Sequence, residues 1–365
     1  MNYEEVFRPS VFSLTEYIAG KTIEEVKREL GLKEIIKLAS NENPYGPHPA
    51  ALEAIREELP NIFMYPEKSF LELKSVLAEF NGVKFENVVV GHGSETIIQI
   101  IPQLFVNPGD EVIMGDKTYG RYEEASRLMD GVIKYVPLKN FTYDLEGIAR
   151  SVTDKTKIIW VCNPNNPTGT IVKSQEVREF LNQIPSRVVV VFDQAYFEYV
   201  EDPEYADGVR FLKEGYPNVI VLRTFSKAYG LAGMRLGYAL MPEKIRQMLD
   251  TIKESFNLNR LSIVAGPACL KGKKWLNEVI RSNSEGRAYL FRKFKEMGLN
   301  AVPSQANFIL VDVGQNAQDL FQRMMKKGVI IRPATGWGYD QYIRVTVGTP
   351  EENEIFISCL KEELA

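Results

Sequence analysis

The sequence predicts an α/β fold with a mostly parallel sheet, followed by a smaller α+β domain. Between about residues 85 and 240, short apolar runs alternate with amphipathic stretches, which is typical of strands connected by helices. After residue 257 the pattern changes to long helical stretches followed by a few strands. The length of 365 residues allows two domains. We expect an N-terminal arm and a helix associated with the small domain over residues 1–45, a large domain over 46–255 and a small domain over 256–365.

The composition favours a globular protein that binds small molecules. The chain is 45% hydrophobic and 25% charged, and its net charge is only −4. It has no run of Lys and Arg typical of proteins that bind nucleic acid or anionic membranes, so we expect neither partner. It has no apolar stretch of the roughly 18 residues that span a bilayer, and it does not begin with a basic and then an apolar segment. We therefore expect a cytoplasmic location.

Histidine and cysteine usage narrows the possible chemistry. The only histidines are His48 and His92, which argues against a histidine-rich metal site or a Ser-His-Asp triad. The three cysteines lie far apart without a CxxC spacing, so we expect buried thiols and no metal. Scarce histidine makes lysine the more natural candidate for proton transfer.

The first elements lead to a loop that is unusually rich in Asn, Pro and Gly. Thr22 and Glu25 have the spacing of a capping box, and Gly31 ends the helix that they begin. A short strand near residues 35–38 runs into the loop, which either connects domains or carries function. Two helices follow, over residues 49–59 and 70–80.

The next strand, near residues 88–90, ends in a glycine turn that begins a helix. Gly93, Ser94 and Glu95 lie at this helix start, where free backbone N–H groups can bind a phosphate. The turn is close to the dinucleotide motif GxGxxG, but the third glycine is replaced by Thr96. A nicotinamide site and a plain strand-to-helix turn remain alternatives.

Three further strands are expected at residues 111–114, 133–137 and 158–162, with a helix over 119–129 between the first two. The third strand ends in the proline-rich loop 163–169, in which the Asn166 amide can both donate and accept hydrogen bonds. A helix near 175–181 follows.

The most apolar strand, residues 188–192, runs directly into Asp193. A carboxylate at the end of a buried strand is costly unless a cation or a strong donor meets it. The alternative is that Asp193 caps a following helix.

The strand at 219–222 is followed by Thr224, Ser226, Lys227 and Arg235. Ligands of open α/β sheets bind at the carboxyl edge, which is where Lys227 lies. A lysine among apolar neighbours loses hydration, so its pKa falls and the neutral amine can attack an aldehyde. Lys227 is therefore either a Schiff-base lysine or a solvated lysine in a loop.

A long helix over residues 242–256 leads into the small domain. Helices are expected at 261–270, 275–297, 320–326 and 351–363, and strands at 307–311, 329–332 and 342–347. Arg332 and Arg344 lie beside apolar strands, where they are either exposed at an edge or hold a substrate carboxylate or phosphate.

One cofactor needs all of these groups at once. A pyridine phosphate with an aldehyde requires a lysine, an acid for its ring nitrogen, an anion cradle, a polar partner for its ring hydroxyl and an aromatic ring against its face. The candidates for these roles, in the same order, are Lys227, Asp193, Gly93-Ser94-Glu95 with Arg235, Asn166 with Tyr196, and Tyr119.

Three segments carry a family resemblance: Asn163-Pro-Asn-Asn-Pro-Thr-Gly169, Phe192-Asp-Gln-Ala-Tyr196 and Thr224-Phe-Ser-Lys-Ala-Tyr-Gly-Leu-Ala-Gly-Met-Arg235. In this order they resemble the class I/II aminotransferases of fold type I, which depend on pyridoxal phosphate. The flanking segments resemble the histidinol-phosphate aminotransferase branch: Lys37 to Pro47, Met64-Tyr-Pro66, Gln305 to Leu310 and Ile343 to Asn353. The resemblance extends from about residue 16 to the C-terminus.

The resemblance implies a large domain with a mostly parallel seven-stranded sheet, a homodimer, and a ping-pong transfer of an amino group from histidinol phosphate to 2-oxoglutarate. It implies that Lys227 binds pyridoxal 5′-phosphate and later moves the substrate proton. The resemblance also implies that Asp193 lies at the ring nitrogen, that Asn166 and Tyr196 lie at the ring oxygen, and that Tyr119 lies on the ring face. The residues implied around the phosphate are Gly93, Ser94, Glu95, Thr224, Ser226 and Arg235. Tyr65 is implied to reach this phosphate from the partner subunit. Arg344 and Arg332 match substrate anion contacts, and Asn43 and Tyr17 match substrate positions more loosely.

Two departures keep other substrates open. The family arm reads Tyr-x-Pro-Gly-Lys, whereas this chain has Tyr17-Ile-Ala-Gly-Lys21, and the loop from Ala334 to Tyr342 is rich in aromatic residues. Both features lie on the substrate side, so an aromatic amino acid aminotransferase is an alternative, and a threonine-phosphate decarboxylase shares much of the pattern. A pyridoxal-phosphate regulator would need a nucleic-acid-binding module for which the chain has no spare residues, and a purely structural protein would leave Asp193, Lys227 and Arg235 unexplained as a set.

Overall fold

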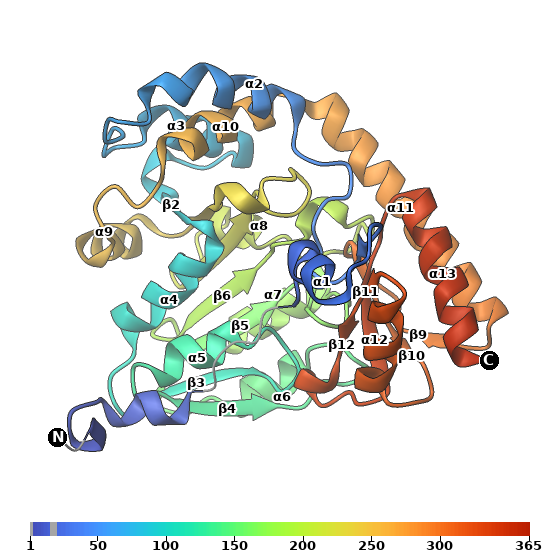
Figure 1. Ribbon diagram of the computed structural model, residues 1–365. Helices are drawn as coiled ribbons and strands as arrows, with labels where there is room; N and C mark the ends of the chain where they lie inside the picture. The colour runs from blue at the N-terminus through green and yellow to red at the C-terminus, as the bar shows by residue number, and fades with distance from the viewer. Residues whose placement is uncertain (1–2, 15–19) are drawn as a thin grey trace.

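A computed structural model describes residues 3–14 and 20–365, and it contains a large seven-stranded sheet beside a smaller domain (Figure 1). The strand order is β2-β8-β7-β6-β5-β3-β4, and all of these strands run in one direction except β8, which is antiparallel to the rest. The predicted α/β class with a mostly parallel sheet is therefore confirmed. The strands are β2 (Val88–His92), β3 (Glu111–Gly115), β4 (Val132–Val136), β5 (Thr156–Cys162), β6 (Val189–Asp193), β7 (Val219–Thr224) and β8 (Leu236–Leu240).

Strand β8 was not predicted, because Gly237 interrupts its short apolar run. The reason for this glycine is the close approach of the next layer. A Cβ at position 237 would lie 2.2 Å from the backbone nitrogen of Ser94, at the start of α4 (Gly93–Phe105). The glycine thus lets the first turn of α4 lie directly against the sheet.

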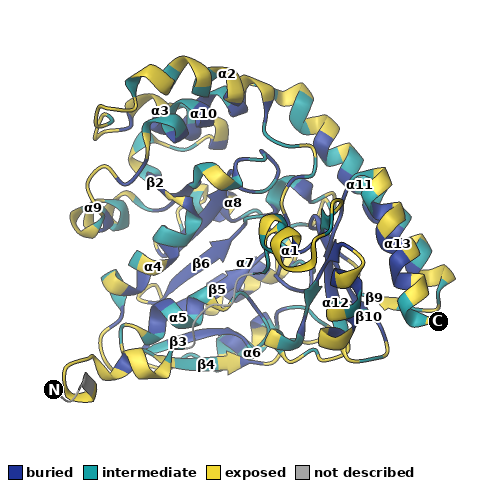
Figure 2. Cartoon of the chain, viewed as in Figure 1, coloured by how far each residue is buried: buried dark blue, intermediate teal, exposed yellow. Residues whose placement is uncertain are grey.

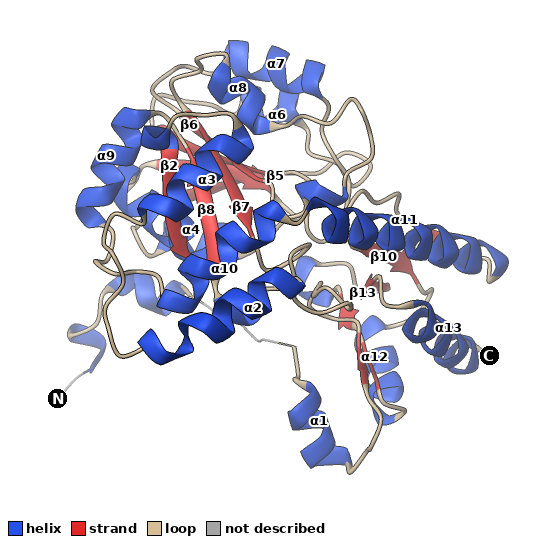
Figure 3. Cartoon of the chain, turned by 90° about the horizontal axis from the view of Figure 1, so that it is seen from above, coloured by secondary structure: helices blue, strands red, loops and turns tan. Residues whose placement is uncertain are grey.

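Helices cover both faces of this sheet, and its central strands are buried throughout (Figures 2 and 3). Figure 3 shows α6, α7 and α8 together at one side and α2, α3 and α10 at the other. The short helices α6 and α8, which are N-capped by Asp144 and Asp207, were not predicted. The remaining helices of this domain are α2 (Pro49–Glu58), α3 (Leu71–Asn81), α5 (Arg121–Arg127), α6 (Leu145–Arg150), α7 (Ser174–Gln183), α8 (Gly208–Lys213), α9 (Glu243–Ile252) and α10 (Arg260–Lys271).

The passage into the small domain differs from the prediction. Helix α9 ends at Ile252 instead of residue 256, because Lys253 is extended and Phe256 turns the chain with a φ of +58°. Ala265 and Cys269 of α10 then pack into the core of the large domain. The predicted boundary at residue 256 stays a prediction. Because α10 packs on the large domain, we propose that the small domain begins after it, at Gly272.

The small domain has an antiparallel sheet of order β12-β13-β10-β9 and its own apolar core. The predicted strand 329–332 is in fact two strands, because β11 pairs with β1 whereas β12 joins the larger sheet. The N-terminal segment is joined to this domain by the β1–β11 pair, and the predicted capping box begins α1. The elements are α1 (Ile23–Leu30), β1 (Ile36–Lys37), α11 (Lys273–Glu296), β9 (Asn300–Ala301), β10 (Phe308–Asp312), α12 (Ala317–Lys326), β11 (Val329–Ile330), β12 (Arg332–Pro333), β13 (Tyr342–Thr346) and α13 (Pro350–Leu364).

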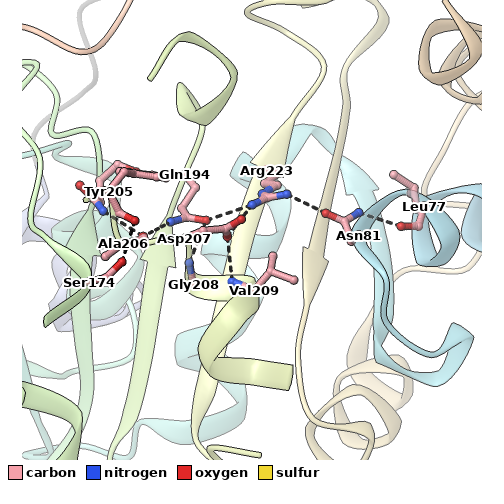
Figure 4. Close-up of polar contacts among 11 residues, drawn as sticks. Leu77, Asn81, Ser174, Gln194, Tyr205, Ala206, Asp207, Gly208, Val209 and Arg223 are labelled. Carbon is pink, nitrogen blue, oxygen red and sulfur yellow. Dashed lines mark hydrogen bonds and ion pairs between the residues drawn. The ribbon is translucent and has the colours of Figure 1, made fainter. Parts of the chain in front are cut away.

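A buried polar network holds the carboxyl ends of β6 and β7 together (Figure 4). Arg223, which precedes Thr224 and is 3% exposed, donates to Asp207 Oδ1 and to Asn81 Oδ1, both at 2.7 Å. It also donates to Gln194 Oε1 at 3.3 Å. Gln194 directly follows Asp193, so the network fixes the backbone on which two of the candidate site segments lie.

Candidate active site

Lys227 follows the end of β7 and points toward the N-terminal loop. Its Nζ donates to the carbonyl of Ser40 at 3.1 Å and lies 5.7 Å from the centre of the Tyr196 ring. Burial, together with the positive charges of Arg344 and Arg235, lowers the pKa of this lysine to about 8. The amine is therefore neutral in more molecules near pH 7 than an ordinary lysine is, and the neutral form is the nucleophile that attacks an aldehyde.

Asp193 is 4% exposed at the end of β6. Its Oδ2 accepts a hydrogen bond from the Tyr122 hydroxyl at 2.7 Å, and its Oδ1 accepts one from the Ala195 N–H at 3.2 Å. Burial raises the pKa of the carboxyl to about 6, against the opposing effect of these hydrogen bonds and of Lys227. A cation beside this carboxylate, such as a protonated ring nitrogen, would relieve the cost of burying it.

Tyr196 and Asn166 lie at the ends of neighbouring strands. The Tyr196 hydroxyl accepts from Asn41 Nδ2 at 3.1 Å, and burial raises the pKa of this phenol. The side-chain oxygen of Asn166 accepts from Arg344 Nη1 at 2.6 Å. Both side chains are buried and polar, and both can hydrogen-bond to a ring oxygen.

The start of α4 and the turn before β8 together present groups that can bind an anion, and we call this place the anion cradle. Gly93 has a φ of +72°, and a Cβ at this position would lie 2.8 Å from Arg235 Nη2. Arg235 is itself in the left-handed region and pairs with Glu95 at 3.4 Å. Thr224 donates to Ser226 Oγ at 3.0 Å beside this turn. This cradle therefore offers a phosphate one guanidinium, two hydroxyls and the N–H groups at the start of a helix. Only a glycine at position 93 leaves room beside the guanidinium.

Tyr119 precedes α5 at the carboxyl end of the sheet. It is half-buried, and its ring meets the edge of Tyr122 at 5.6 Å and 80°. Since Tyr122 in turn contacts Asp193, Tyr119 belongs to the same side-chain cluster as the buried carboxylate.

The two arginines predicted to contact substrate anions face the aromatic loop that follows β12. The guanidinium carbons of Arg344 and Arg332 lie 5.3 and 5.8 Å from the Trp337 ring. Trp337 Nε1 donates to the carbonyl of Thr118 at 2.9 Å, which joins this loop to the residue before Tyr119. The arginines and the cofactor-side residues thus share one interdomain region.

The remaining predicted site residues differ in their surroundings. Asn43 is buried and donates to the carbonyl of Ala228 at 2.9 Å, next to Lys227. Tyr65 is 81% exposed and stacks on Phe256 at 4.9 Å. Tyr17 lies outside the described residues.

Sequence reasoning missed three residues of this region: Asn41, Tyr122 and Trp337. Asn41 has a φ of +56° and, besides its bond to Tyr196, accepts from Thr346 Oγ1 at 3.2 Å. Its place in the Asn-rich loop was a usable signal, because asparagine tolerates the left-handed region. Trp337 lies in the aromatic loop that the sequence placed on the substrate side, although it was not singled out there. Tyr122 gave no such signal, since aromatic residues near helical segments mostly just pack.

Neither a metal site nor a membrane span occurs within residues 3–14 and 20–365. Groups of three or more His, Cys, Asp or Glu side chains that could hold a metal ion are absent there. The helices in the same ranges are too short or too polar to cross a bilayer.

The family model for aminotransferase class I and II matches residues 33–360. The chain belongs to this family. The aminotransferase is 45% identical to the histidinol-phosphate aminotransferase of Moorella thermoacetica, over 98% of this chain and 93% of that protein. It is 43% identical to that of Caldicellulosiruptor saccharolyticus, over 98% of this chain and 100% of that protein. The predicted resemblance to this branch is therefore confirmed, and the nicotinamide alternative is set aside.

A solved structure agrees with this assignment. The aminotransferase superposes on histidinol-phosphate aminotransferase from Sinorhizobium meliloti, solved in complex with pyridoxal-5′-phosphate, with a TM-score of 0.90. The two are 29% identical, over 98% of this chain and 97% of that chain.

Proposed function

We propose that this aminotransferase uses pyridoxal 5′-phosphate to transfer the amino group of histidinol phosphate to 2-oxoglutarate. The observation that carries the proposal is that Lys227, a lysine of lowered pKa, and the buried carboxylate of Asp193 lie at the ends of the adjacent strands β7 and β6. The names of the relatives and the cofactor in the Sinorhizobium meliloti structure support it. When bound, the cofactor supplies an aldehyde that condenses with amines and a protonated ring that accepts the electron pair of the substrate Cα–H bond.

We assign each residue of the site a role toward the bound cofactor. Lys227 would hold the aldehyde end of the cofactor, and its amine would move a proton between the substrate Cα and the cofactor C4′ atom. Asp193 would keep the ring nitrogen protonated. Asn166 and Tyr196 would hold the ring oxygen, and Tyr119 would cover the ring face.

The phosphate is assigned to the cradle around the start of α4. Glu95 brings a negative charge to this place, but it pairs with Arg121 at 2.9 Å and with Arg235 at 3.4 Å. Its contribution is therefore the backbone N–H of the helix start. The residues of the cradle are Gly93, Ser94, Glu95, Thr224, Ser226 and Arg235.

The two substrates carry different anionic groups, and two arginines can bind both kinds of anion. Histidinol phosphate carries a phosphate and glutamate carries two carboxylates, and a guanidinium forks onto either anion. We assign Arg344 and Arg332 to these anions, with Asn43 and Tyr17 as further substrate contacts.

We further propose a homodimer in which Tyr65 reaches the phosphate of the partner's site. Tyr65 belongs to a surface run of large apolar side chains, which a second copy would cover. The run consists of Ile62, Phe63, Met64 and Tyr65, exposed by 62, 81, 43 and 81%. The proposal includes a cytoplasmic location, which is consistent with three free cysteines.

Subunit mixing tests the shared site. Lys227→Ala and Tyr65→Ala homodimers should both be impaired. A mixed dimer restores one site that has Lys227 from one subunit and Tyr65 from the other, so activity should rise on mixing. If Tyr65 serves its own subunit, mixing restores nothing.

The substrate is tested by single half-reactions followed by absorbance. Histidinol phosphate and glutamate should each convert the visible band of the bound cofactor, and this band should be absent in Lys227→Ala. Phenylalanine or tyrosine reacting in place of histidinol phosphate would move the assignment to an aromatic aminotransferase, for which the cluster of Trp337, Tyr339 and Tyr342 is the favouring observation. Carbon dioxide released from threonine phosphate would indicate a decarboxylase.

A further inference from the structure

Tyr122 is clamped in the interior beside Asp193. Its side chain is fully buried, at 0% exposure, and its ring is parallel to Trp160 at 4.6 Å and 5°. Its hydroxyl donates to Asp193 Oδ2 at 2.7 Å. The stacked rings leave the phenol little freedom, so this hydrogen bond is held in one orientation.

The same ring also supports Tyr119. The edge of Tyr122 meets the Tyr119 ring at 5.6 Å and 80°, which is a favourable aromatic geometry. One buried side chain therefore contacts two residues with different proposed tasks, Asp193 at the ring nitrogen and Tyr119 on the ring face.

The phenol is a permanent donor here. Burial and the neighbouring Asp193 charge raise the pKa of Tyr122 well above its ordinary value, so the hydroxyl keeps its proton at neutral pH. A hydrogen bond donated to a carboxylate favours its charged form, which offsets part of the burial cost of Asp193.

We propose that Tyr122 is a positioning residue that keeps the Asp193 carboxylate charged and aimed at the ring nitrogen of the cofactor. The inference rests on the proposed function. Without the hydroxyl, Asp193 would hold a proton more tightly, and the proton shared with the ring nitrogen would move toward the carboxyl. The residue acts through Asp193 and does not itself contact the reacting atoms.

The test is Tyr122→Phe, which removes one oxygen and retains both ring contacts. Two readouts do not depend on activity: the affinity of the apoenzyme for pyridoxal phosphate, and the ¹⁵N chemical shift of labelled cofactor in the holoenzyme. We expect the affinity to fall by roughly tenfold, the scale of one hydrogen bond to a charged group. We expect the ¹⁵N signal to move toward that of the unprotonated ring.

Tyr143→Phe is the matched control. Tyr143 is also buried, at 6% exposure, but its hydroxyl donates to Thr118 Oγ1 at 2.8 Å and not to Asp193. The Tyr143→Phe variant should be less stable than the wild-type protein, but its ¹⁵N signal should not move. If Tyr122→Phe fails to fold, 3-fluorotyrosine at position 122 keeps the shape, donates more strongly and should move the signal in the opposite direction.

The outcomes separate the two proposals. A wild-type protein that takes up no pyridoxal phosphate contradicts the proposed function. If the wild-type protein gives the ¹⁵N signal of a protonated ring, and Tyr122→Phe gives the same signal and the same affinity, then only the proposed role of Tyr122 is overturned.

Discussion

The Arg344 guanidinium donates to the side-chain oxygen of Asn166 at 2.6 Å, and so joins a residue assigned to the substrate to one assigned to the cofactor. The same guanidinium donates through Nη2 to the carbonyl of Ala39 at 2.6 Å. It is therefore held from both sides by the two segments that flank the site. This arrangement fixes the plane of the guanidinium before an anion binds, which lowers the entropy cost of binding.

The substitution Arg344→Lys should break this arrangement while keeping the charge. A lysine ammonium is a point donor on a flexible stem, and it cannot reproduce the planar fork that reaches Asn166 and Ala39. We expect the KM for glutamate and for histidinol phosphate to rise by roughly tenfold to hundredfold, the scale of a lost charge-assisted bond. Steady-state kinetics measure the change.

Retention of the cofactor band is the control for Arg344→Lys. The expected split is a raised KM with an affinity for pyridoxal phosphate that changes little. An unchanged KM for both substrates would contradict the assignment of Arg344 to their anions.

Asp193→Asn should stabilise the apoprotein while impairing catalysis. The carboxyl pKa is raised from 3.8 to about 6 in the folded chain, so between these values the folded state binds more protons than the unfolded state. Its stability therefore falls as pH rises through this window, by up to about 3 kcal/mol above pH 6. Asparagine keeps an oxygen acceptor for Tyr122 and avoids this cost.

Urea unfolding of both apoproteins across pH measures the effect. The stability gain of Asp193→Asn should be absent below about pH 4 and constant above about pH 6. With the cofactor, we expect the catalytic rate to fall by roughly 10² to 10³, the scale of one lost electrostatic partner. A gain that is equal at pH 3 and pH 7 would contradict the linkage to Asp193.

The ends of β6 and β7 could be predicted from the sequence because each of these strands is a buried apolar run followed by a polar residue. Asp193 and Lys227 were singled out in this way, and the parallel arrangement brings the ends of β6 and β7 to one edge of the sheet. The local signals at Thr22 and Glu25 were equally readable, since capping depends on neighbours in the sequence.

The missed contacts join residues that are far apart in the chain. Tyr122 and Asp193 are 71 positions apart, and Trp337 and Thr118 are 219 apart. Such contacts depend on how two elements pack, and no local pattern encodes this. Gly237 shows the same limit, because its role is the close approach of Ser94 from another element.

The capture of the cofactor aldehyde should depend on pH through Lys227. Only the neutral amine reacts, and the lysine pKa is about 8, so the capture rate should rise about tenfold per unit at low pH and level off above pH 8. Stopped-flow absorbance of apoprotein mixed with pyridoxal phosphate measures the profile.

A second variant checks the cause of this pKa shift. The Arg344 charge lowers the pKa of Lys227, so Arg344→Gln should move the midpoint to higher pH. A midpoint that stays in place would mean that the Arg344 charge does not contribute to the lowered pKa of Lys227.

Arg223→Met should destabilise the fold without directly removing a site residue. Arg223 is buried, and its loss leaves Asp207, Asn81 and Gln194 without a common donor (Figure 4). Removing one partner of a buried ion pair costs roughly 3–5 kcal/mol, and the low end applies because the Asp207 side chain is 46% exposed. Arg210→Met breaks an exposed pair with Glu214 and should cost at most about 1 kcal/mol in the same urea titration.

Gly93→Ala tests the anion cradle at its narrowest point. The backbone φ of +72° strains any residue other than glycine, and the new Cβ would lie 2.8 Å from Arg235 Nη2. The guanidinium can move, but it would then leave its place beside the start of α4. We expect the affinity for pyridoxal phosphate to fall by roughly tenfold, the scale of a weakened bond to a charged group, in a fluorescence titration of the apoprotein.

Gly109→Ala separates backbone strain from the loss of the cradle. Gly109 has a φ of +84°, and a Cβ at this position would meet no other described residue within 4 Å beyond its chain neighbours, so the substitution introduces strain without a clash. Both variants should lose about 1 kcal/mol or more of stability to this strain, but only Gly93→Ala should bind the cofactor more weakly. Equal affinities in the two variants would show that the cradle tolerates a methyl group, and the phosphate would then have to lie away from Gly93 and Arg235.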